Sequence, residues 1–248
     1  MIKQELLYDK ILGHFGSASI FIFLIPLFWG LLKYKNFNIS LRIFYFFVIA
    51  EFLNVLLIRL FSWATLKYID FWQPFLVQFQ IDSTNFFILF SYLSRFGILG
   101  YYFIITTKLV SKYALLKFFP LILLIVAFFD FFFITGYNNN SVLGQTLLDF
   151  YVIFFTLIQL WYIYRENSKV LLNRNPYFWI NMGLLFPSVF SIWLSIFGTN
   201  LYEQDFILYC QVSIISIIFY CIGMLLIARG FYFARYAQYL PQHQVKTD

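Results

Sequence analysis

Residues 41–66 read LRIFYFFVIAEFLNVLLIRLFSWATL, and this stretch decides the fold. A helix over it, at about 1.5 Å per residue, is longer than the roughly 30 Å hydrocarbon layer of a bilayer. Between Arg42 and Lys67 the only Asp, Glu, Lys or Arg residues are Glu51 and Arg59. The stretch therefore predicts a membrane-spanning helix with two charged side chains in its interior.

The rest of the chain repeats this pattern of long apolar runs between charged or turn-forming residues. Each run is about twice the length of a membrane β-strand and shows no alternation, which indicates helices. We predict an all-α integral membrane bundle of seven transmembrane helices, forming one domain over residues 1–248. The predicted spans are approximately 15–32, 41–66, 85–107, 113–135, 146–164, 177–197 and 206–228.

The composition excludes a soluble domain. Hydrophobic residues make up 62% of the chain and charged residues 11%, whereas a soluble domain has about 25% charged residues. The net charge of +6 does not indicate nucleic-acid binding, because the basic residues lie mostly in short connections between apolar runs. Glu5 and Asp9 precede the first run and no small-residue cleavage site follows it, so we expect it to be retained as a helix rather than removed as a signal peptide.

Charge asymmetry between the connections predicts the orientation, because Lys and Arg accumulate in short cytoplasmic loops. The connections after the second, fourth and sixth runs are poor in basic residues, with Lys67 alone against several carboxylates. With seven spans, the N-terminus is then outside and the C-terminus in the cytoplasm, as expected of a multi-pass protein of the bacterial inner membrane. The basic residues on the cytoplasmic side are Lys33, Lys35, Arg42, Lys108, Lys112, Lys117, Arg165, Lys169, Arg174, Arg229, Arg235 and Lys246.

Charged side chains within predicted spans are the first candidates for a functional site, because they are costly in hydrocarbon and usually face the bundle interior. Glu51 and Arg95 enter from opposite sides and reach similar depths, so we predict that they meet near the midplane. Polar stripes on the predicted spans 2, 3, 6 and 7 point to one shared interior. The candidate ligand-binding or coupling residues are Glu51, Asn54, Arg59, Arg95 and Asp149, and Asp130 is a further intramembrane carboxylate.

Two interpretations of these polar residues remain open. Ser, Thr and Asn commonly join helices through hydrogen bonds, and a Glu–Arg pair can be a packing device only. Alternatively, the residues line an outward-open pocket whose mixed charges suit a polar or zwitterionic small molecule.

Several kinds of chemistry have no sequence support. The two histidines, His14 and His243, lie outside the spans, which excludes His-based metal sites and Ser/His/Asp catalysis. The last predicted span contains no lysine for a retinal Schiff base. Cys210 and Cys221 fall in that span and are expected to be small apolar side chains. We predict no metal, no cofactor and no catalytic residues.

Three short motifs resemble a group of small bacterial seven-helix membrane proteins of unknown function. They are Glu51-Phe52-Leu53-Asn54, Thr84-Asn85 with Tyr92, and Asn175-Pro176-Tyr177-Phe178-Trp179-Ile180-Asn181. Members of that group often carry His and Glu along span 3, where this chain has Phe90 and Phe96. The resemblance implies the topology without implying an activity.

Three functions are consistent with these features. The first is a non-enzymatic receptor or sensory subunit that works with a separate cytoplasmic or membrane partner. The second is a small-solute or proton-coupled transporter that uses the Glu51–Arg95 region. The third is an enzyme acting on lipid-embedded substrates, for which no carboxylate pair has a recognisable catalytic spacing. For a receptor, the basic and aromatic tail that begins at Arg229 is the expected output surface.

Overall fold

The computed structural model describes residues 2–81, 83–107, 114–136, 138–139, 141–165 and 171–239. In these residues every regular element is a helix, and six helices are long and apolar enough to cross a membrane. They are Lys10–Asn36, Ile39–Lys67, Asn85–Thr106, Val142–Arg165, Pro176–Gln204 and Phe206–Tyr232. The predicted all-α class is confirmed, and the architecture is that of a helical membrane bundle.

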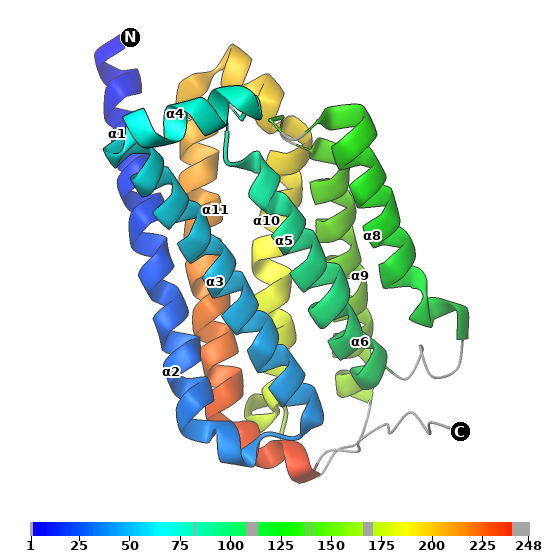
Figure 1. Cartoon of the computed structure of the whole chain (residues 1–248). Helices are drawn as coiled ribbons and strands as arrows, with labels where there is room; N and C mark the ends of the chain where they lie inside the picture. The colour runs from blue at the N-terminus through cyan, green and yellow to red at the C-terminus, as the bar shows by residue number, and fades with distance from the viewer. Residues whose placement is uncertain are drawn as a thin grey trace.

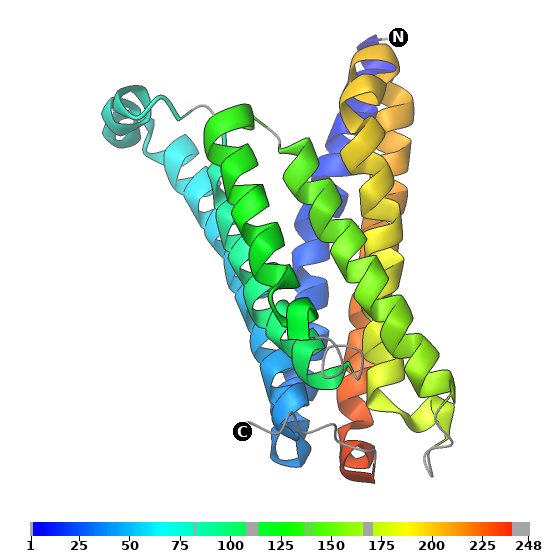
Figure 2. The same cartoon turned by 90° about the vertical axis from the view of Figure 1, so that its right-hand side faces the viewer.

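The long helices run side by side in one bundle, with short connections at both ends (Figures 1 and 2). We call the end that carries α4 and the N-terminus the α4 end, and the opposite end, which carries η8, the η8 end. In chain order the main elements are α1 (Ile2–Ala18), η1 (Ser19–Phe23), α2 (Leu24–Lys33), α3 (Ile39–Lys67), α4 (Ile69–Gln78), α5 (Ile88–Tyr92), η4 (Leu93–Leu99), α6 (Gly100–Thr106), α8 (Phe119–Phe129), η6 (Asp130–Thr135), α9 (Val142–Arg165), α10 (Pro176–Gln204), α11 (Phe206–Tyr232) and η8 (Ala234–Tyr239).

The predicted fourth span contains one shorter apolar helix among the described residues. The apolar helix here covers Phe119–Thr135, whereas the prediction was 113–135. Pro120 lies in the first turn of α8, where its missing N–H costs nothing, and a short 3₁₀ segment precedes it. Residue 113 lies outside the described residues, as do Asp82, Lys108, Lys112, Lys169, His243 and Lys246.

One predicted loop contains a helix. The break between the second and third spans, 67–84, includes α4, which lies across one end of the bundle rather than along it (Figure 1). Pro74 lies inside this helix, and most of its large apolar side chains are exposed. A ten-residue segment with a proline gives too weak a periodic pattern for sequence reasoning to separate it from a loop.

Polar caps determine where three of the long helices begin. The Asn38 side chain accepts a hydrogen bond from Leu41 N (3.1 Å), Asn175 accepts one from Tyr177 N (2.9 Å), and Asp205 accepts one from Leu208 N (3.0 Å). Each cap satisfies a backbone N–H that the first helical turn leaves unpaired. The Asn38 amide also donates to the Tyr177 hydroxyl (2.7 Å), which joins α3 to α10 at the η8 end.

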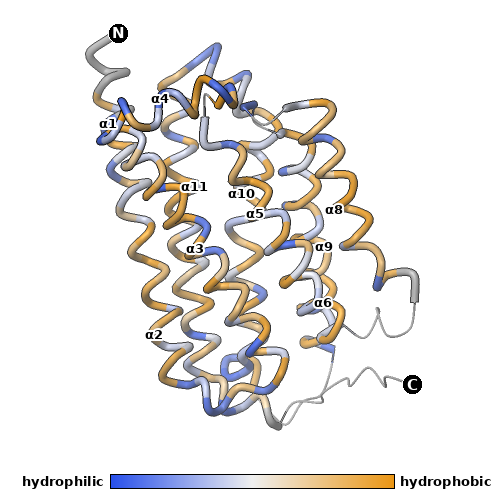
Figure 3. The backbone as a smooth tube through the Cα atoms, in the orientation of Figure 1, coloured by the Kyte–Doolittle hydropathy of each residue, from blue (hydrophilic) through white to orange (hydrophobic). Residues whose placement is uncertain are grey.

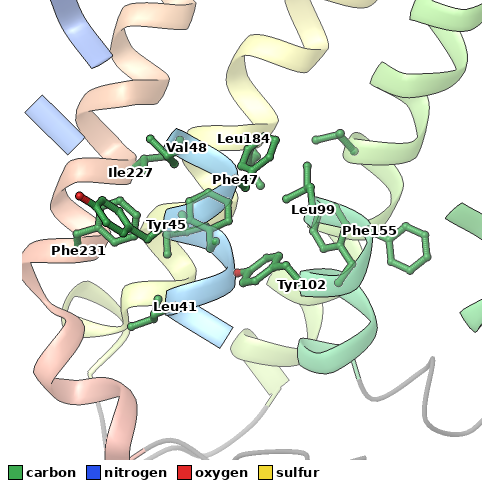
Figure 4. Packing of buried hydrophobic residues seen from close by; sticks show 14 of the residues in the cluster. Leu41, Tyr45, Phe47, Val48, Leu99, Tyr102, Phe155, Leu184, Ile227 and Phe231 are labelled. Atoms are coloured by element: carbon green, nitrogen blue, oxygen red, sulfur yellow. The ribbon is translucent and has the colours of Figure 1, made fainter. Parts of the chain in front are cut away.

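Aromatic side chains fill the half of the bundle nearest η8 (Figure 4). Phe44, Tyr102 and Phe231 are fully buried, and the Phe44 and Tyr102 ring centroids are 5.0 Å apart. Phe231 stacks on Phe37 at 5.2 Å and meets the Tyr45 ring edge-on at 5.6 Å. These rings are therefore in close contact with one another in this half of the bundle.

Hydrophobic residues predominate along the helices, and hydrophilic residues are more frequent near their ends (Figure 3). α8 illustrates this, because Leu121, Ile122, Ile125 and Phe129 are each more than half exposed. A soluble protein rarely exposes so continuous an apolar face, whereas a lipid-facing helix does so by default.

Candidate functional site

The site begins with an ion pair between α3 and η4. Arg95 Nη2 lies 3.2 Å from Glu51 Oε2, and Arg95 Nε lies 3.3 Å from the same oxygen. Both residues are far from either end of their spans, as the sequence predicted from their depths. The predicted meeting of Glu51 and Arg95 is present in the structure.

Hydroxyl and amide groups extend this pair along the α3–η4 contact. The Ser94 hydroxyl donates to Glu51 Oε1, so both carboxylate oxygens have a donor. One turn away, the Asn54 amide donates to Ser91 Oγ at 2.8 Å. The Asn54 carbonyl oxygen is buried and has no hydrogen-bond partner among the described residues.

Arg95 lies in a π-helical segment. η4 covers Leu93–Leu99 and interrupts an otherwise α-helical span. A π-helical turn widens the helix and occurs preferentially at functional sites, because it displaces side chains from their regular positions. The irregular backbone coincides with the one Lys or Arg residue of this span.

A cavity of about 240 Å³, which we call the central cavity, lies beside the ion pair. Its walls come from η1, α3, η4, α9, α10 and α11, and α8 contributes nothing to it. The Arg95 side chain retains 30% of its surface accessible although it lies deep in the bundle, because it faces this space. The polar residues of the wall are Glu51, Arg95, Asp149, Ser188, Ser191, Ser216 and Tyr220.

Asp149 supplies a second carboxylate to the same cavity. It is 2% exposed, and Ser191 and Ser195 on α10 lie close enough for their hydroxyls to interact with its carboxylate. Arg95 is close enough for the two charges to attract, yet Asp149 forms no ion pair with any residue that the structure describes. The central cavity therefore contains two carboxylates and one guanidinium.

The structure brings together four of the five predicted site residues. Glu51, Arg95 and Asp149 line the central cavity, and Asn54 adjoins the ion pair through Ser91. Arg59 is not part of this site, because it lies about 12 Å farther along α3 than Glu51. Its guanidinium Nη2 is 3.5 Å from the place that a Cβ on Gly16 would take, beside α1.

Sequence reasoning identified the polar stripes on α10 and α11 but missed other parts of the wall. Ser94 was missed because it lies one position from Arg95, off the regular helical stripe. Gly183 and Pro187 line the cavity without polar side chains, so no composition signal identified them. Asn181 was placed on the stripe of α10, but its amide bonds back to Tyr177 O within its own helix (2.8 Å).

Asp130 belongs to a separate buried cluster near the α4 end. The Tyr92 hydroxyl donates to Ser141 Oγ (2.9 Å), and the Ser141 hydroxyl donates to Asp130 Oδ2. Thr135 Oγ1 donates to the other carboxylate oxygen at 3.1 Å. This cluster joins α5 and η6 through Ser141, the residue directly before α9, and it does not line the central cavity.

The chemistry of the central cavity is suited to binding. A guanidinium already engaged by one carboxylate, a second carboxylate and three serine hydroxyls can orient a small polar molecule, and the apolar wall excludes bulk water. Among the described residues, no group of three or more His, Cys, Asp and Glu side chains could hold a metal ion.

Comparison with protein-family models, with curated proteins and with solved structures finds no match to this chain.

Proposed function

We propose that the chain is a seven-span protein of the bacterial inner membrane, with its N-terminus outside and its C-terminus in the cytoplasm. The α4 end then faces out and the η8 end faces in. In support, Lys33, Arg174 and Arg229 lie at the η8 end, with further basic residues beside them. The α10–α11 connection at the α4 end contains Glu203 and Asp205 and no basic residue.

Labelling of single cysteines tests this orientation. In a variant lacking Cys210 and Cys221, an impermeant thiol reagent added outside intact cells should modify Asn139→Cys and should leave Arg174→Cys unmodified. Both positions are exposed, so the contrast reports the side of the membrane. Lys112→Cys is a second inner-side position. Modification of Arg174→Cys from outside would reverse the proposed orientation.

We further propose that the protein is a receptor or sensory subunit that binds a small polar molecule in the central cavity. The observation that carries this proposal is a cavity enclosed by six of the seven spans, with Glu51, Arg95 and Asp149 on its wall. The aromatic packing around Phe44 and Tyr102 closes the η8 side. We propose that the ligand enters from the opposite, outer side, which suits detection of an outside molecule.

The η8 end offers a basic and aromatic surface for a partner. The Arg229 guanidinium lies 4.0 Å from the centroid of the Trp179 ring, and Arg235 donates to the Tyr236 hydroxyl at 2.9 Å. The segment is also part of the core, because Phe231, Ala234 and Ala237 are fully buried. Truncation after Gly230 would remove these core side chains together with the proposed partner surface. Substitutions at exposed positions are therefore the better test of that surface.

Cross-linking in cells tests whether a change in the central cavity alters contact with a partner at the η8 end. A photo-reactive residue at Tyr232, which is 49% exposed, should cross-link one specific protein in cells, and the cross-link should change in Arg95→Gln cells. Tyr164, at the same end on α9 and 80% exposed, is the matched control position. A cross-linking pattern identical in wild type and Arg95→Gln would contradict signalling from the cavity.

A transporter is the second candidate function, and the Glu51–Arg95 pair favours it. Intramembrane ion pairs of this kind serve as proton or substrate relays in transporters. Purified chain in proteoliposomes should then move solute or protons without a partner. Substrate-dependent uptake by the isolated chain, lost in Glu51→Gln, would favour this function over the receptor.

A further inference from the structure

A second hollow, which we call the vestibule, opens near the α4 end between α9, α10 and α11. Its volume is about 400 Å³, and Gln145, Ser191, Ser195, Thr199, Tyr202 and Tyr209 contribute its polar wall. It differs from the central cavity in having no charged residue in its wall. Because α10 runs toward the α4 end from Ser191 to Tyr202, the vestibule extends from mid-bundle toward that end.

The vestibule and the central cavity share one wall residue, Ser191. This residue lines both spaces. Asp149 belongs to the wall of the central cavity, and the two serines near its carboxylate, Ser191 and Ser195, both line the vestibule. The carboxylate therefore lies at the junction of the two spaces, where their walls adjoin.

The charge at this junction is negative. In the central cavity Glu51 is neutralised by Arg95 through two contacts to one oxygen, whereas Asp149 has no ion pair among the described residues. α9 and α10 contain no Lys or Arg between the vestibule and the α4 end, and neither does α11. A carboxylate in a low-dielectric passage focuses its field, because water screens it poorly.

The mouth of the vestibule also favours positively charged molecules. The rings of Tyr202 and Tyr209 meet edge-on with centroids 5.3 Å apart, and aromatic rings attract cations. Glu203 and Asp205 follow Tyr202 directly and are exposed at the same end. The route from mouth to junction thus offers acidic side chains, then aromatic rings, then hydroxyls and a carboxylate.

We propose that the vestibule is the entry route to the central cavity, and that the ligand is a small organic cation whose charged group docks at Asp149. This inference rests on the proposed function, since it names the ligand class of that site. The apolar wall of the central cavity receives the remainder of the molecule, and Arg95 stays paired with Glu51. Asp149 is thus a ligand-binding residue and the specificity-determining residue for positive charge.

Charge-selective thiol labelling tests the route without knowledge of the ligand. Single cysteines at Ser195 in the vestibule and at Asn139 on the α4-end surface are placed in the chain lacking native cysteines. Each is treated from outside with a trimethylammonium-bearing methanethiosulfonate or its sulfonate-bearing counterpart, and rates are normalised to a free thiol. We expect the normalised preference for the cationic reagent to be about tenfold or more at Ser195→Cys and near one at Asn139→Cys.

Asp149→Asn provides the decisive comparison, because it keeps the shape and removes the charge. In this background the preference at Ser195→Cys should fall by at least severalfold, while Asn139→Cys is unchanged. An unchanged preference, or no modification of Ser195→Cys from outside, would overturn the proposal.

Choline and its uncharged isostere 3,3-dimethylbutan-1-ol provide the second measurement. Choline should raise the unfolding temperature of wild-type chain in lipid nanodiscs, the isostere should not, and Asp149→Asn should lose the choline effect. Equal effects of the two compounds would refute a cationic ligand. If labelling is charge-selective but Tyr232 cross-linking never responds to Arg95→Gln, the cation route stands and the receptor function fails.

Discussion

The Glu51–Arg95 pair gives the most quantitative prediction. Replacing Arg95 and replacing Glu51 should lower the free energy of unfolding by different amounts. Arg95→Gln leaves a carboxylate whose side chain is 9% exposed with the Ser94 hydroxyl as its remaining donor. Removing one partner of a buried pair costs about 3–5 kcal/mol of the free energy of unfolding. The variant also leaves Asp149 as a second uncompensated carboxylate in the same cavity.

Glu51→Gln should cost less, for two reasons in the geometry. Arg95 keeps Asp149 as a nearby opposite charge, and 30% of its side chain faces the central cavity, where water can solvate it. The Gln carbonyl can still accept from the Arg95 guanidinium, so the loss is an ion pair replaced by a hydrogen bond with only one charged partner. We expect about 1–2 kcal/mol.

A double-mutant cycle measured by reversible unfolding in mixed micelles checks both values. Neutral hydrogen bonds between membrane helices couple by about 0.6 kcal/mol, so a charge pair should exceed about 1 kcal/mol. The Ser62→Ala and Thr65→Ala pair on α3 is the control, because both hydroxyls bond only to carbonyls of their own helix. Coupling below the neutral value, or equal costs of the two single changes, would refute the assignment of a buried charge pair.

Three further predictions concern stability. Gly223→Ala should lower the free energy of unfolding by about 1–3 kcal/mol, because its Cβ would lie 2.5 Å from Gly183 O and 2.6 Å from Pro187 Cγ. The control is Gly13→Ala, whose Cβ meets nothing within 4 Å. It should be neutral or slightly stabilising in the same unfolding assay. Ser141→Ala removes a donor from buried Asp130 and should lower the free energy of unfolding by about 1–3 kcal/mol. Tyr92→Phe should cost less, because it removes only the hydroxyl that donates to Ser141. The reverse order in chemical denaturation would count against this hydrogen-bonded chain from Tyr92 through Ser141 to Asp130. Asp149→Asn should change the free energy of unfolding by less than about 1 kcal/mol, since Asp149 has no ion pair among the described residues. A loss of stability comparable to that of Arg95→Gln would show a structural role for Asp149 instead.

The helical bundle could be predicted from the sequence because long apolar runs have few alternatives. The six long helices agree with six predicted spans, differing mainly at their ends. The Glu51–Arg95 contact was also predictable, since depth along a helix follows from residue count alone. For the predicted fourth span, 113–135, hydropathy does not show that a 3₁₀ segment over Ala114–Lys117 precedes the proline in the first turn of α8.

Other features depended on tertiary structure that no local pattern contains. Arg59 lies on the same helix as Glu51, yet the packing of α3 against α1 takes its guanidinium to Gly16. The π-helical turn at Arg95 and the close Gly183–Gly223 contact have no periodic sequence signal. The vestibule lies between α9, α10 and α11 near one end, so its existence depends on helix tilt, which span length does not determine.

The central claim is that the cavity beside Glu51, Arg95 and Asp149 binds a small molecule. Mass spectrometry of small molecules that co-purify with the wild-type chain and with Ser216→Trp tests it most directly, because Ser216 lines that cavity and tryptophan would fill it. Matching unfolding temperatures of the two proteins in nanodiscs would establish that both are folded. The account predicts a small cationic compound enriched on the wild-type chain and lost from Ser216→Trp. No compound enriched on the wild-type chain over the filled variant would contradict it.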